Sequence, residues 1–488
     1  MKCTIMLTSW RLTAIAVSLL LPLSAAATDT VSVTLNPGDD IQAAVDAHPP
    51  GTTYILQAGT YRMQSIVPKN GDVFDGKSAA ILNGSRLLAV FERKGNVWVA
   101  SDQTQKGYVL ETRTCQRGFP RCSRPEDLFV DDKPLRHVDS MYEVTRGAWY
   151  FDYRKNKVYL GDDPAGKMVE IGVTPRAFGG EASNVIVRNL TVEKYAAPHS
   201  AIDATSGNAW IVENNLVRLN HSLAVDAGPN SKIIRNKLVQ NGQQGYGAGG
   251  KNFLFEGNEI ANNNYAGVDF EWEAGGGKAT EIPDGAVIRG NCVHGNDGPG
   301  IWADENVRGL IIENNVVFDN SANGIMYEIS YDGIIRNNLV ANNGKKKFGW
   351  FWGPQILVAG SSNVQVYGNR IDVPAEYGNA ITIVAQDRSP YPVAVGNQIF
   401  NNTIIMRGTE ARVGAATDVS SYTTLVATKN TMRQNEYHVA NLATAFWHWN
   451  NRDLSWTQIA GEGQEVGSTI DDLLPPKPQL DCAFLRLH

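Results

Sequence analysis

Hydrophobic residues along most of this chain occur in short aliphatic or β-branched runs that Gly and Asn separate. An Asn, one further residue and an aliphatic residue recur, with the Asn at Asn214, Asn236, Asn258, Asn291, Asn314, Asn337, Asn369 and Asn402. The steps between these Asn residues are 22, 22, 33, 23, 23, 32 and 33 residues, which indicates a repeat architecture. Each unit is too short for a strand–helix–strand crossover and has almost no helical periodicity, so we predict the coils of a parallel β-solenoid.

The repeated Asn residues have a structural explanation. Asn tolerates the left-handed backbone conformation that a sharp corner needs, and its amide can hydrogen-bond to the equivalent amide one coil above and below. We therefore expect an Asn ladder inside the solenoid, and we assign none of these residues to catalysis.

The segments outside the repeats predict caps and an insertion. Asp40 is a suitable N-cap for a short amphipathic helix that begins at Ile41, and such a helix would cover the open end of a solenoid. Between about residues 89 and 171 the repeat gives way to alternating segments with turns between them, which predict a small inserted antiparallel β-domain. Residues 453–459 indicate a helical turn at the carboxy end.

The amino terminus predicts export. Lys2 and Arg11 precede an apolar stretch at 12–23 and three Ala residues at 25–27, which is the pattern of a secretory signal cleaved after Ala27. We expect a periplasmic or extracellular protein with no membrane contact after cleavage. The predicted segments are a signal peptide (1–27), a cap with the first coils (28–88), the inserted β-domain (89–171), the central coils (172–410) and the last coils with a carboxy-terminal cap (411–488).

The composition limits the classes of function. With 488 residues, 43% of them hydrophobic, the chain can bury a large core. The formal net charge of −6 gives no basic excess, so a nucleic-acid partner is not expected. Cys115 and Cys122 suit a small disulfide loop in an oxidising compartment, and Cys292 would then pair with Cys482. No CxxC or paired His accompanies these cysteines, so we predict no metal site from them.

Three acids recur at equivalent positions of successive repeats. The segments 267–271 and 300–304, and the next one at 324–328, each begin with Gly and end with an acid, namely Glu271, Asp304 and Glu328. Because side chains alternate along a strand, we predict that these acids share one outward column, with Asp269 on the same face. Parallel strands stack about 4.8 Å apart, so neighbouring acids should lie about 5 Å apart and the outer two about 10 Å apart.

This localised carboxylate column favours acid–base chemistry. Three ionised carboxylates so close together would repel one another strongly, so at least one should keep a proton near neutrality. We assign the general acid to Glu271 or Glu328 and the base or nucleophile to Asp304, with Asp269 and Glu273 in support. Separations of about 5 Å suit a retaining glycosidase and about 6.5 to 9.5 Å an inverting one. The sequence leaves both open, although the gap across two coils favours inversion slightly.

The residues beside the acids suit sugar binding. Glu273 and Lys278 lie in a segment that lengthens one coil, and extra residues in a solenoid form loops on one face, often the binding face. Trp272 and Trp302 offer flat apolar surfaces on which a sugar ring can stack. We therefore predict that these four residues contact substrate.

His294 and the basic residues leave a second chemistry open. His294, in the turn before Asp304, could hold a carboxylate or a substrate hydroxyl, or only be hydrogen-bonded within the protein. A polysaccharide lyase needs a base for the proton next to a uronate carboxylate and a cation to neutralise that carboxylate. Lys278 and Arg308 are candidates, and the acidic column could hold Ca²⁺. We predict no cofactor and no metal for a hydrolase, and Ca²⁺ only for a lyase.

With these residues in view, the chain resembles the right-handed parallel β-helix superfamily of pectate-lyase-like, carbohydrate-active proteins, from Val31 to about Ile470. The segments 300–304 and 324–331 look like segments that recur in exported members. The resemblance implies an all-β right-handed parallel β-helix, and acids on a strand face of the central coils as in β-helix glycoside hydrolases that carry an inserted β-domain. The paired-Asp motifs of polygalacturonases and the Arg-rich motif of pectate lyases are absent.

We predict an exported glycoside hydrolase that degrades a polysaccharide or oligosaccharide. Asp304→Ala should abolish turnover with little loss of folding, because Asp304 is expected to face outward. The alternatives are a polysaccharide lyase or uronate C5-epimerase in the same groove, and a non-catalytic glycan-binding solenoid. Only a lyase would give unsaturated products that absorb in the ultraviolet, and a binding solenoid would show affinity without turnover. The sugar, its linkage and the oligomeric state stay open.

Overall fold

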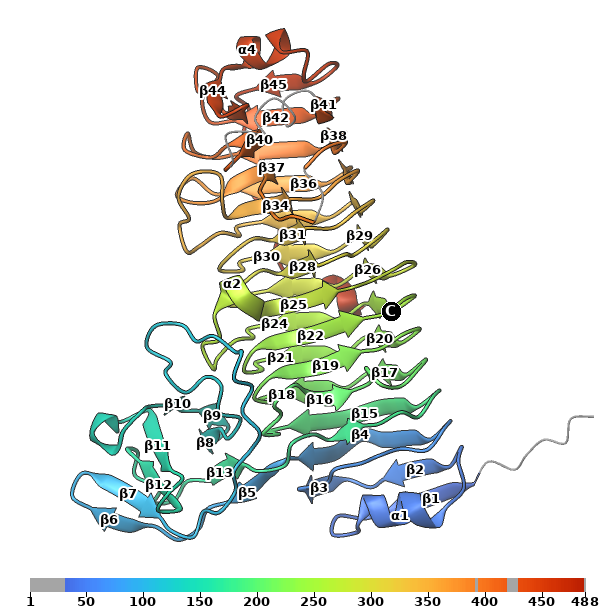
Figure 1. Cartoon of the computed structure of the whole chain (residues 1–488), viewed down its shortest axis with the longest axis vertical. Coiled ribbons are helices and arrows are strands. Elements are labelled where there is room, and N and C mark those ends of the chain that lie inside the picture. Colours follow the sequence, from blue (N-terminus) through green and yellow to red (C-terminus); the bar gives the residue numbers. More distant parts are fainter. Residues whose placement is uncertain (1–30, 391–393, 419–428, 487–488) are drawn as a thin grey trace, which may run out of the picture.

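The computed structural model describes residues 31–390, 394–418 and 429–486, whose strands stack as the coils of a parallel β-helix (Figure 1). The predicted all-β solenoid, with its amino-terminal capping helix and inserted β-domain, is confirmed. The predicted signal peptide at 1–27 lies outside the described residues. None of the described helices is long and apolar enough to cross a membrane.

Two sheets form the walls of the β-helix. In the 24-stranded sheet most coils contribute two short strands. In the 12-stranded sheet the coils from β14 onward contribute one strand each, and the sheet ends in the antiparallel pair β43–β44. The 24-stranded sheet contains β1 (Ser32–Leu35), β2 (Thr53–Leu56), β3 (Gly59–Arg62), β4 (Val73–Asn83), β15 (Ile186–Glu193), β17 (Ile211–Glu213), β18 (Leu216–Arg218), β20 (Lys232–Ile234), β21 (Lys237–Val239), β23 (Leu254–Glu256), β24 (Glu259–Ala261), β26 (Val287–Arg289), β27 (Cys292–His294), β29 (Ile311–Glu313), β30 (Val316–Phe318), β32 (Ile334–Arg336), β33 (Leu339–Ala341), β35 (Gln365–Tyr367), β36 (Arg370–Val373), β38 (Gln398–Phe400), β39 (Thr403–Met406), β41 (Thr431–Arg433), β42 (Glu436–Val439) and β45 (Thr469–Asp471). The 12-stranded sheet contains β14 (Phe178–Gly179), β16 (Ser200–Asp203), β19 (Leu223–Ala227), β22 (Gln244–Gly249), β25 (Gly275–Thr280), β28 (Ile301–Asp304), β31 (Ile325–Glu328), β34 (Pro354–Ala359), β37 (Asn379–Ala385), β40 (Val413–Thr417), β43 (Trp447–Trp449) and β44 (Arg452–Leu454).

Aliphatic side chains stack in columns inside the β-helix. Ile301, Ile325, Ile356 and Ile381 occupy equivalent positions of four successive strands of the 12-stranded sheet. All four are fully buried in one core that runs through the coils. Burial of an aliphatic side chain of this size stabilises the fold by about 1.5–3 kcal/mol, so these columns are a main source of stability.

Two Asn ladders run through the interior. The first joins Asn215, Asn236, Asn258, Asn291, Asn315, Asn338, Asn369, Asn402 and Asn435, where each amide oxygen accepts from the preceding Asn. The predicted members Asn214, Asn314 and Asn337 are wrong by one residue. They take the left-handed conformation, with φ of 55°, 56° and 57°, while their neighbours enter the ladder. The left-handed corner and the ladder hydrogen bonds, which we had assigned to a single Asn, therefore belong to two adjacent residues.

The second ladder was not predicted. It runs through Asn220, Asn241, Asn263, Asn296, Asn320 and Asn343, and it ends on Gln355. This ladder lies where each coil turns from the 24-stranded sheet into the 12-stranded sheet, so it holds the strands of the 12-stranded sheet in register.

Helices close the two ends of the β-helix (Figure 1). α1 (Ile41–Ala47) begins at Asp40, whose side chain accepts a hydrogen bond from the Ala43 backbone N–H as expected of an N-cap. Ile41 and Val45 are buried under it. At the other end α4 (Trp456–Gly461) covers the last coils, and it begins three residues later than the turn that we predicted from Asp453.

The inserted domain consists of two small sheets that are antiparallel apart from one pair. They contain β5 (Ser85–Leu87), β13 (Val169–Gly172), β8 (Leu128–Val130) and β9 (Lys133–Pro134) in one sheet, and β10 (Arg136–His137), β11 (Ala148–Asp152), β12 (Lys157–Leu160), β7 (Val97–Ala100) and β6 (Glu92–Lys94) in the other. Both predicted disulfides, Cys115–Cys122 and Cys292–Cys482, are present. The second one fixes the carboxy-terminal tail beside the middle coils, next to β26 in Figure 1.

Candidate active site

Asp304 and Glu328 lie next to each other on the outward face of the 12-stranded sheet. They end the adjacent parallel strands β28 and β31, whose register places Ala303 opposite Tyr327. Ala303 and Tyr327 point into the core, so the following residues point outward and lie level with each other. The predicted alignment of these two coils is therefore confirmed.

Both carboxylates are buried although they face away from the core. Asp304 is 4% exposed and Glu328 is 7% exposed. Asp304 faces outward as expected, but surrounding side chains cover it, so outward orientation does not make it free of buried contacts. Its removal would therefore leave buried partners uncompensated, and Asp304→Asn is a better test of catalysis than Asp304→Ala.

The predicted third acid is not in this column. Residue Thr280 of β25 pairs with Asp304, whereas Glu271 lies exposed in the short helix α2 (Phe270–Glu273). Asp269 caps this helix by accepting a hydrogen bond from the Glu271 backbone N–H. The predicted register of residues 267–271 is therefore wrong.

The glycine run explains this difference. We expected Gly275, Gly276 and Gly277 to form a loop, but they form the first half of β25. A Cβ on Gly276 would come within 2.1 Å of the Gly300 carbonyl oxygen, and one on Gly277 within 2.1 Å of the Tyr246 ring. Only residues without a side chain fit between these neighbours, so here glycine permits a strand to pack closely.

Lys278 completes the acid pair. Its Nζ lies 2.8 Å from Asp304 Oδ2 and 4.3 Å from the centroid of the Trp302 ring. Because this ion pair is buried, the ammonium group stabilises the negative charge on Asp304. We predicted that Lys278 contacts substrate, and the structure places it beside the central carboxylate.

Glu328 has a different electrostatic environment. Burial raises the pKa of its carboxyl to about 7, and the nearby charge of Asp304 contributes to the increase. Arg388, whose Nη1 lies 3.0 Å from Glu328 Oε1, and Lys278 partly offset these effects. The Trp302 indole N–H also favours the charged form, although it is buried without a hydrogen bond of normal geometry. A substantial fraction of Glu328 therefore carries a proton near neutral pH.

An apolar pocket of about 380 Å³ adjoins Glu328. Its wall includes Phe270 of α2, Met326 of β31, and Phe348 and Trp352 from the loop before β34. These four side chains are partly exposed, and such surfaces can stack against a sugar ring. Glu271, Trp302, Gln386 and Arg388 also line this pocket.

A second, polar pocket of about 200 Å³ lies on the other side of the acid pair. Lys278 and Thr280 line it together with Asp226, Glu273 and Gly247. Burial raises the pKa of Asp226 to about 7, with the negative charges of Asp203 and Glu273 as further causes. Burial also raises the pKa of Glu273. The two pockets follow each other along the outward face of the 12-stranded sheet, and we call this face the groove. Glu328 lines the apolar pocket, whereas Asp304 lies on β28 between the two sets of lining residues and lines neither pocket.

Sequence reasoning missed Asp226. It lies on β19, two strands before β25 in the sheet, and a Cβ on Gly247 between them would come within 2.8 Å of its Oδ1. The alignment of Asp203 with Asp226 on adjacent strands is a signal that could have found it. Glu273, which we predicted to contact substrate, lines the polar pocket.

Two other predicted residues lie elsewhere. His294 belongs to β27 of the 24-stranded sheet, where its Nε2 lies 3.6 Å from Glu259 Oε1. We placed His294 in the turn before Asp304, but it ends strand β27, and the turn that follows carries the chain to the other wall. Trp272 packs partly buried against the Cys115–Cys122 loop, and it does not line either groove pocket.

The coiled fold matches a known family model. A family model described as a right-handed β-helix region matches residues 200–371. The resemblance to right-handed parallel β-helix proteins is therefore confirmed. No protein of curated function matches the sequence.

Solved structures of carbohydrate-active proteins share this fold. The complex of XylC with xylose matches with a TM-score of 0.68 and 15% identity, over 90% of this chain and 83% of that chain. The A-module of the Azotobacter vinelandii mannuronan C-5 epimerase AlgE4 matches with a TM-score of 0.50 and 15% identity, over 90% and 94%. A mannuronic acid specific polysaccharide family 6 lyase from human gut microbiota matches with 0.51 and 11%, over 91% and 92%. At these identities the similarity shows the fold, and the reaction has to be argued from the groove.

Proposed function

We propose that this chain is an exported glycoside hydrolase that acts on an oligosaccharide or polysaccharide with retention of configuration. Glu328 is the general acid and base, and Asp304 is the nucleophile. The observation that carries the proposal is that two level carboxyls on adjacent strands differ in their surroundings: Asp304 pairs with the buried Lys278, whereas burial raises the pKa of Glu328 although it pairs with the more exposed Arg388. The two disulfides fit an oxidising, extracytoplasmic compartment.

The spacing of the carboxyls supports retention. The Cα atoms of level residues on neighbouring strands lie about 4.8 Å apart, a spacing that allows their carboxyl groups the separation of about 5 to 5.5 Å used by retaining glycosidases. The sequence favoured inversion slightly because Glu271 and Glu328 would have been two coils apart. With Thr280 in place of Glu271, that longer separation no longer exists in the column.

The two environments assign the roles. A general acid needs a proton near neutrality, and Glu328 has a raised pKa. A nucleophile must be ionised, and the Lys278 ammonium stabilises the charge on Asp304.

The two steps follow from these roles. Asp304 attacks the anomeric carbon while the glycosidic C–O bond breaks, and Glu328 gives its proton to the leaving oxygen. Glu328, now a carboxylate, then takes a proton from water. That water attacks the anomeric carbon, breaks the bond to Asp304 and restores both residues.

The groove supports a sugar substrate on both sides of the acid pair. The apolar pocket offers Phe270, Phe348 and Trp352 for ring stacking, and the polar pocket offers Asp226 and Glu273 as partners for hydroxyl groups. The similarity to the XylC–xylose complex makes xylosides sensible first substrates.

A glycan panel tests the proposal. Purified protein is incubated with neutral and uronate-containing glycans and with aryl glycosides, with and without chelator, while reducing ends and absorbance near the enone band are followed together. We expect new reducing ends without absorbance, and loss of activity by about 10³-fold or more in Glu328→Gln and Asp304→Asn. Undiminished activity in either variant would refute its assigned role.

A lyase or uronate epimerase is the second candidate. Arg388 lies beside Glu328, and Lys278 lies beside Asp304. Either residue could neutralise a uronate carboxylate or act as the base that removes the proton from the carbon next to it. Such an enzyme could also bind Ca²⁺ at its acids. Absorbance near the enone band, or activity that chelator removes, would favour this candidate over the hydrolase.

A further inference from the structure

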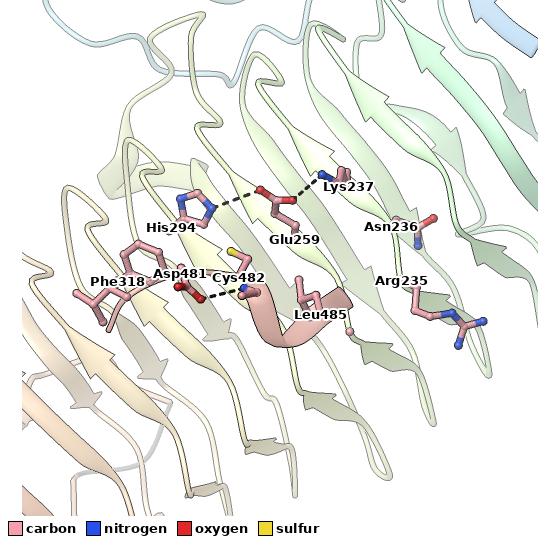
Figure 2. Close-up of a pocket in the computed structure, with 12 residues that line it drawn as sticks. Arg235, Asn236, Lys237, Glu259, His294, Phe318, Asp481, Cys482 and Leu485 are labelled. Atoms are coloured by element: carbon pink, nitrogen blue, oxygen red, sulfur yellow. Dashed lines mark hydrogen bonds and ion pairs between the residues drawn. The ribbon is translucent and has the colours of Figure 1, made fainter. Parts of the chain in front are cut away.

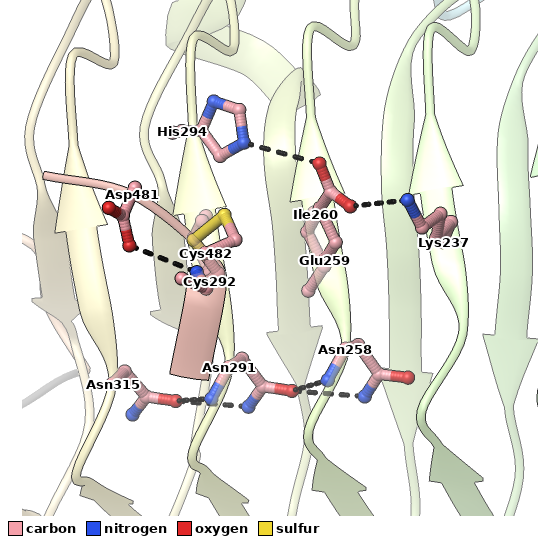
Figure 3. The surroundings of a disulfide bond; sticks show 12 residues. Lys237, Asn258, Glu259, Ile260, Asn291, Cys292, His294, Asn315, Asp481 and Cys482 are labelled. Atoms are coloured by element: carbon pink, nitrogen blue, oxygen red, sulfur yellow. Dashed lines mark hydrogen bonds and ion pairs between the residues drawn. A yellow bond between two sulfur atoms is a disulfide. The ribbon is translucent and has the colours of Figure 1, made fainter. Parts of the chain in front are cut away.

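The disulfide Cys292–Cys482 lies outside the proposed active site, on the 24-stranded sheet. It joins β27 to the carboxy-terminal tail, which ends in the 3-10 turn η3 (Ala483–Arg486) (Figure 3). The tail and the sheet enclose a pocket of about 660 Å³, with Glu259 and His294 in its wall (Figure 2). The pocket therefore contains sulfur, imidazole and carboxylate groups together.

His294 is held in place with a ring nitrogen that makes no hydrogen bond. Its ring stacks on Phe318 with 4.8 Å between centroids and 6° between planes. Its Nε2 is buried and makes no hydrogen bond, since the nearest carboxylate oxygen, Glu259 Oε1, is 3.6 Å away. A buried ring nitrogen without a hydrogen bond is costly, so a ligand closer than Glu259 would be stabilising.

The donor atoms are already gathered. Cys292 and His294 are two residues apart on β27, so they point to the same side of the sheet. One donor atom from each of Cys292, His294 and Cys482 lies within 4.8 Å of the others. Glu259 pairs with Cys292 on the adjacent strand, and Lys237 Nζ lies 3.2 Å from its Oε2. Figure 3 shows the Glu259 carboxylate between His294 and Lys237, on the strand next to the disulfide.

We infer that reduction of Cys292–Cys482 creates a binding site for a thiolate-preferring divalent cation such as Zn²⁺. Cys292, Cys482 and His294 are the ligands, and the Glu259 carboxylate, which lies beside His294 but outside this three-donor cluster, turns to supply the fourth. Two thiolates, one imidazole and one carboxylate match the tetrahedral set that Zn²⁺ prefers. The oxidised protein lacks the site, because its two sulfur atoms are bonded to each other.

The chemistry balances with a dithiol or phosphine as the reductant. The reductant supplies two electrons and water or the dithiol supplies two protons, so that the S–S bond becomes two thiols while the reductant is oxidised. Binding of the cation then displaces the two thiol protons. Loss of two electrons would re-form the disulfide and release the cation, so metal and disulfide are alternative ways to hold the tail on β27.

Cobalt binding tests the inference on the full chain. Cys3→Ser/Cys115→Ser/Cys122→Ser leaves Cys292 and Cys482 as the only cysteines. This variant is reduced under anaerobic conditions, freed of reductant and titrated with Co²⁺. We expect one equivalent to bind with sulfur-to-cobalt charge-transfer and tetrahedral d–d bands, and Zn²⁺ to displace it. The same variant kept oxidised should show no bands.

The His294 variant separates a built site from two free thiols. His294→Ala in the same background should lower Co²⁺ affinity by more than about tenfold, since even outer partners of metal sites contribute 10- to 100-fold. His438→Ala, several coils away on β42, is the matched control and should leave the affinity unchanged. Far-ultraviolet circular dichroism reports whether each reduced variant keeps its sheets. Absence of the bands from the reduced chain, folded or unfolded, would overturn the inference, and so would equal affinity in His294→Ala.

Discussion

Lys278 and Asp304 form a buried ion pair on adjacent strands of the 12-stranded sheet, with Nζ 2.8 Å from Oδ2. Lys278 pairs with Trp302 in the strand register, and Asp304 lies two residues further along β28. The Lys278 side chain therefore spans the gap between the strands and also extends along β28 to reach the acid. This relationship gives Asp304 a cation of its own. The neighbouring Glu328 pairs with Arg388, whose side chain is 43% exposed to solvent.

Removal of Lys278 should cost stability as well as activity. Lys278→Met leaves the Asp304 carboxylate buried without its cation, and breaking a buried pair in this way costs about 3–5 kcal/mol. Urea unfolding at neutral pH measures the loss. The double variant Lys278→Met/Asp304→Leu should recover much of it. If Lys278→Met unfolds at the same urea concentration as the wild type, the ion pair does not stabilise the fold.

The raised pKa of Glu328 sets the pH dependence of activity. The acid step needs the protonated carboxyl, so kcat/KM on an unactivated substrate should fall as pH rises through about 7. An aryl glycoside with a good leaving group needs less protonation and should show a weaker fall. Identical high-pH limbs for the two substrates would argue against Glu328 as the acid.

The same group should make stability depend on pH. Because its pKa is raised from 4.5 to about 7, the folded protein binds this proton more tightly than the unfolded chain. The contribution of Glu328 to the free energy of unfolding should therefore decrease as pH rises between these values. Urea unfolding over this range should show a smaller decrease for Glu328→Gln than for the wild type, and equal slopes would contradict the assignment.

Glu271 provides a direct comparison between the sequence-based and structural assignments. Its helix lines the apolar pocket, but its side chain is exposed and Thr280 occupies the column position. Glu271→Gln should therefore lower kcat/KM by less than about tenfold, against about 10³-fold or more for Glu328→Gln. Equal losses in the two variants would restore the three-acid column.

The Cys115–Cys122 loop supports the wall of the groove from the inserted domain. The Asp269 backbone N–H donates to the Thr114 carbonyl, and the Gln116 side chain donates to Asp297 at 2.9 Å. Cys115→Ser/Cys122→Ser should loosen α2 and raise KM more than it lowers kcat. Steady-state kinetics with the other disulfide intact provide the measurement. Unchanged KM would show that α2 holds its position without the loop.

The two roles of adjacent Asn residues can be separated by mutation. Asn315→Ala removes two ladder hydrogen bonds and leaves buried amides unpaired, at about 1–3 kcal/mol for each unsatisfied group. Asn314→Gly keeps the left-handed turn and should cost well under 1 kcal/mol. Thermal or urea unfolding of both variants measures these losses. A larger loss of stability in Asn314→Gly than in Asn315→Ala would contradict the two roles.

The fold could be predicted because the repeat is regular. Most coils bury aliphatic residues at the same positions relative to an Asn, and Asp40, the insertion and both disulfides carry local signals. The Asn step alone could not show which member of an Asn pair enters the ladder. Asn214 and Asn215 are adjacent, and only strand pairing across coils fixes the choice.

The site was predictable where its coils have standard length. Asp304 and Glu328 align because 24 residues separate them without an insertion, whereas the longer coil before them carries both α2 and β25. From sequence alone the strand could begin at Gly267 or at the glycines 275–277. Close packing of these glycines against Gly300 and Tyr246 places the strand at the second position. The pairing of Lys278 with Asp304 follows from that register, so it could not be predicted.

The most direct test of the central claim is trapping of the glycosyl-enzyme. An activated 2-deoxy-2-fluoro glycoside of an accepted sugar is incubated with the protein, and the labelled peptide is identified by mass spectrometry. The proposal predicts a stable ester on Asp304, in Glu328→Gln as well as in the wild type when the leaving group is good. A label on another residue, or first-formed product of inverted configuration by NMR, would contradict the assignment of Asp304 as the nucleophile.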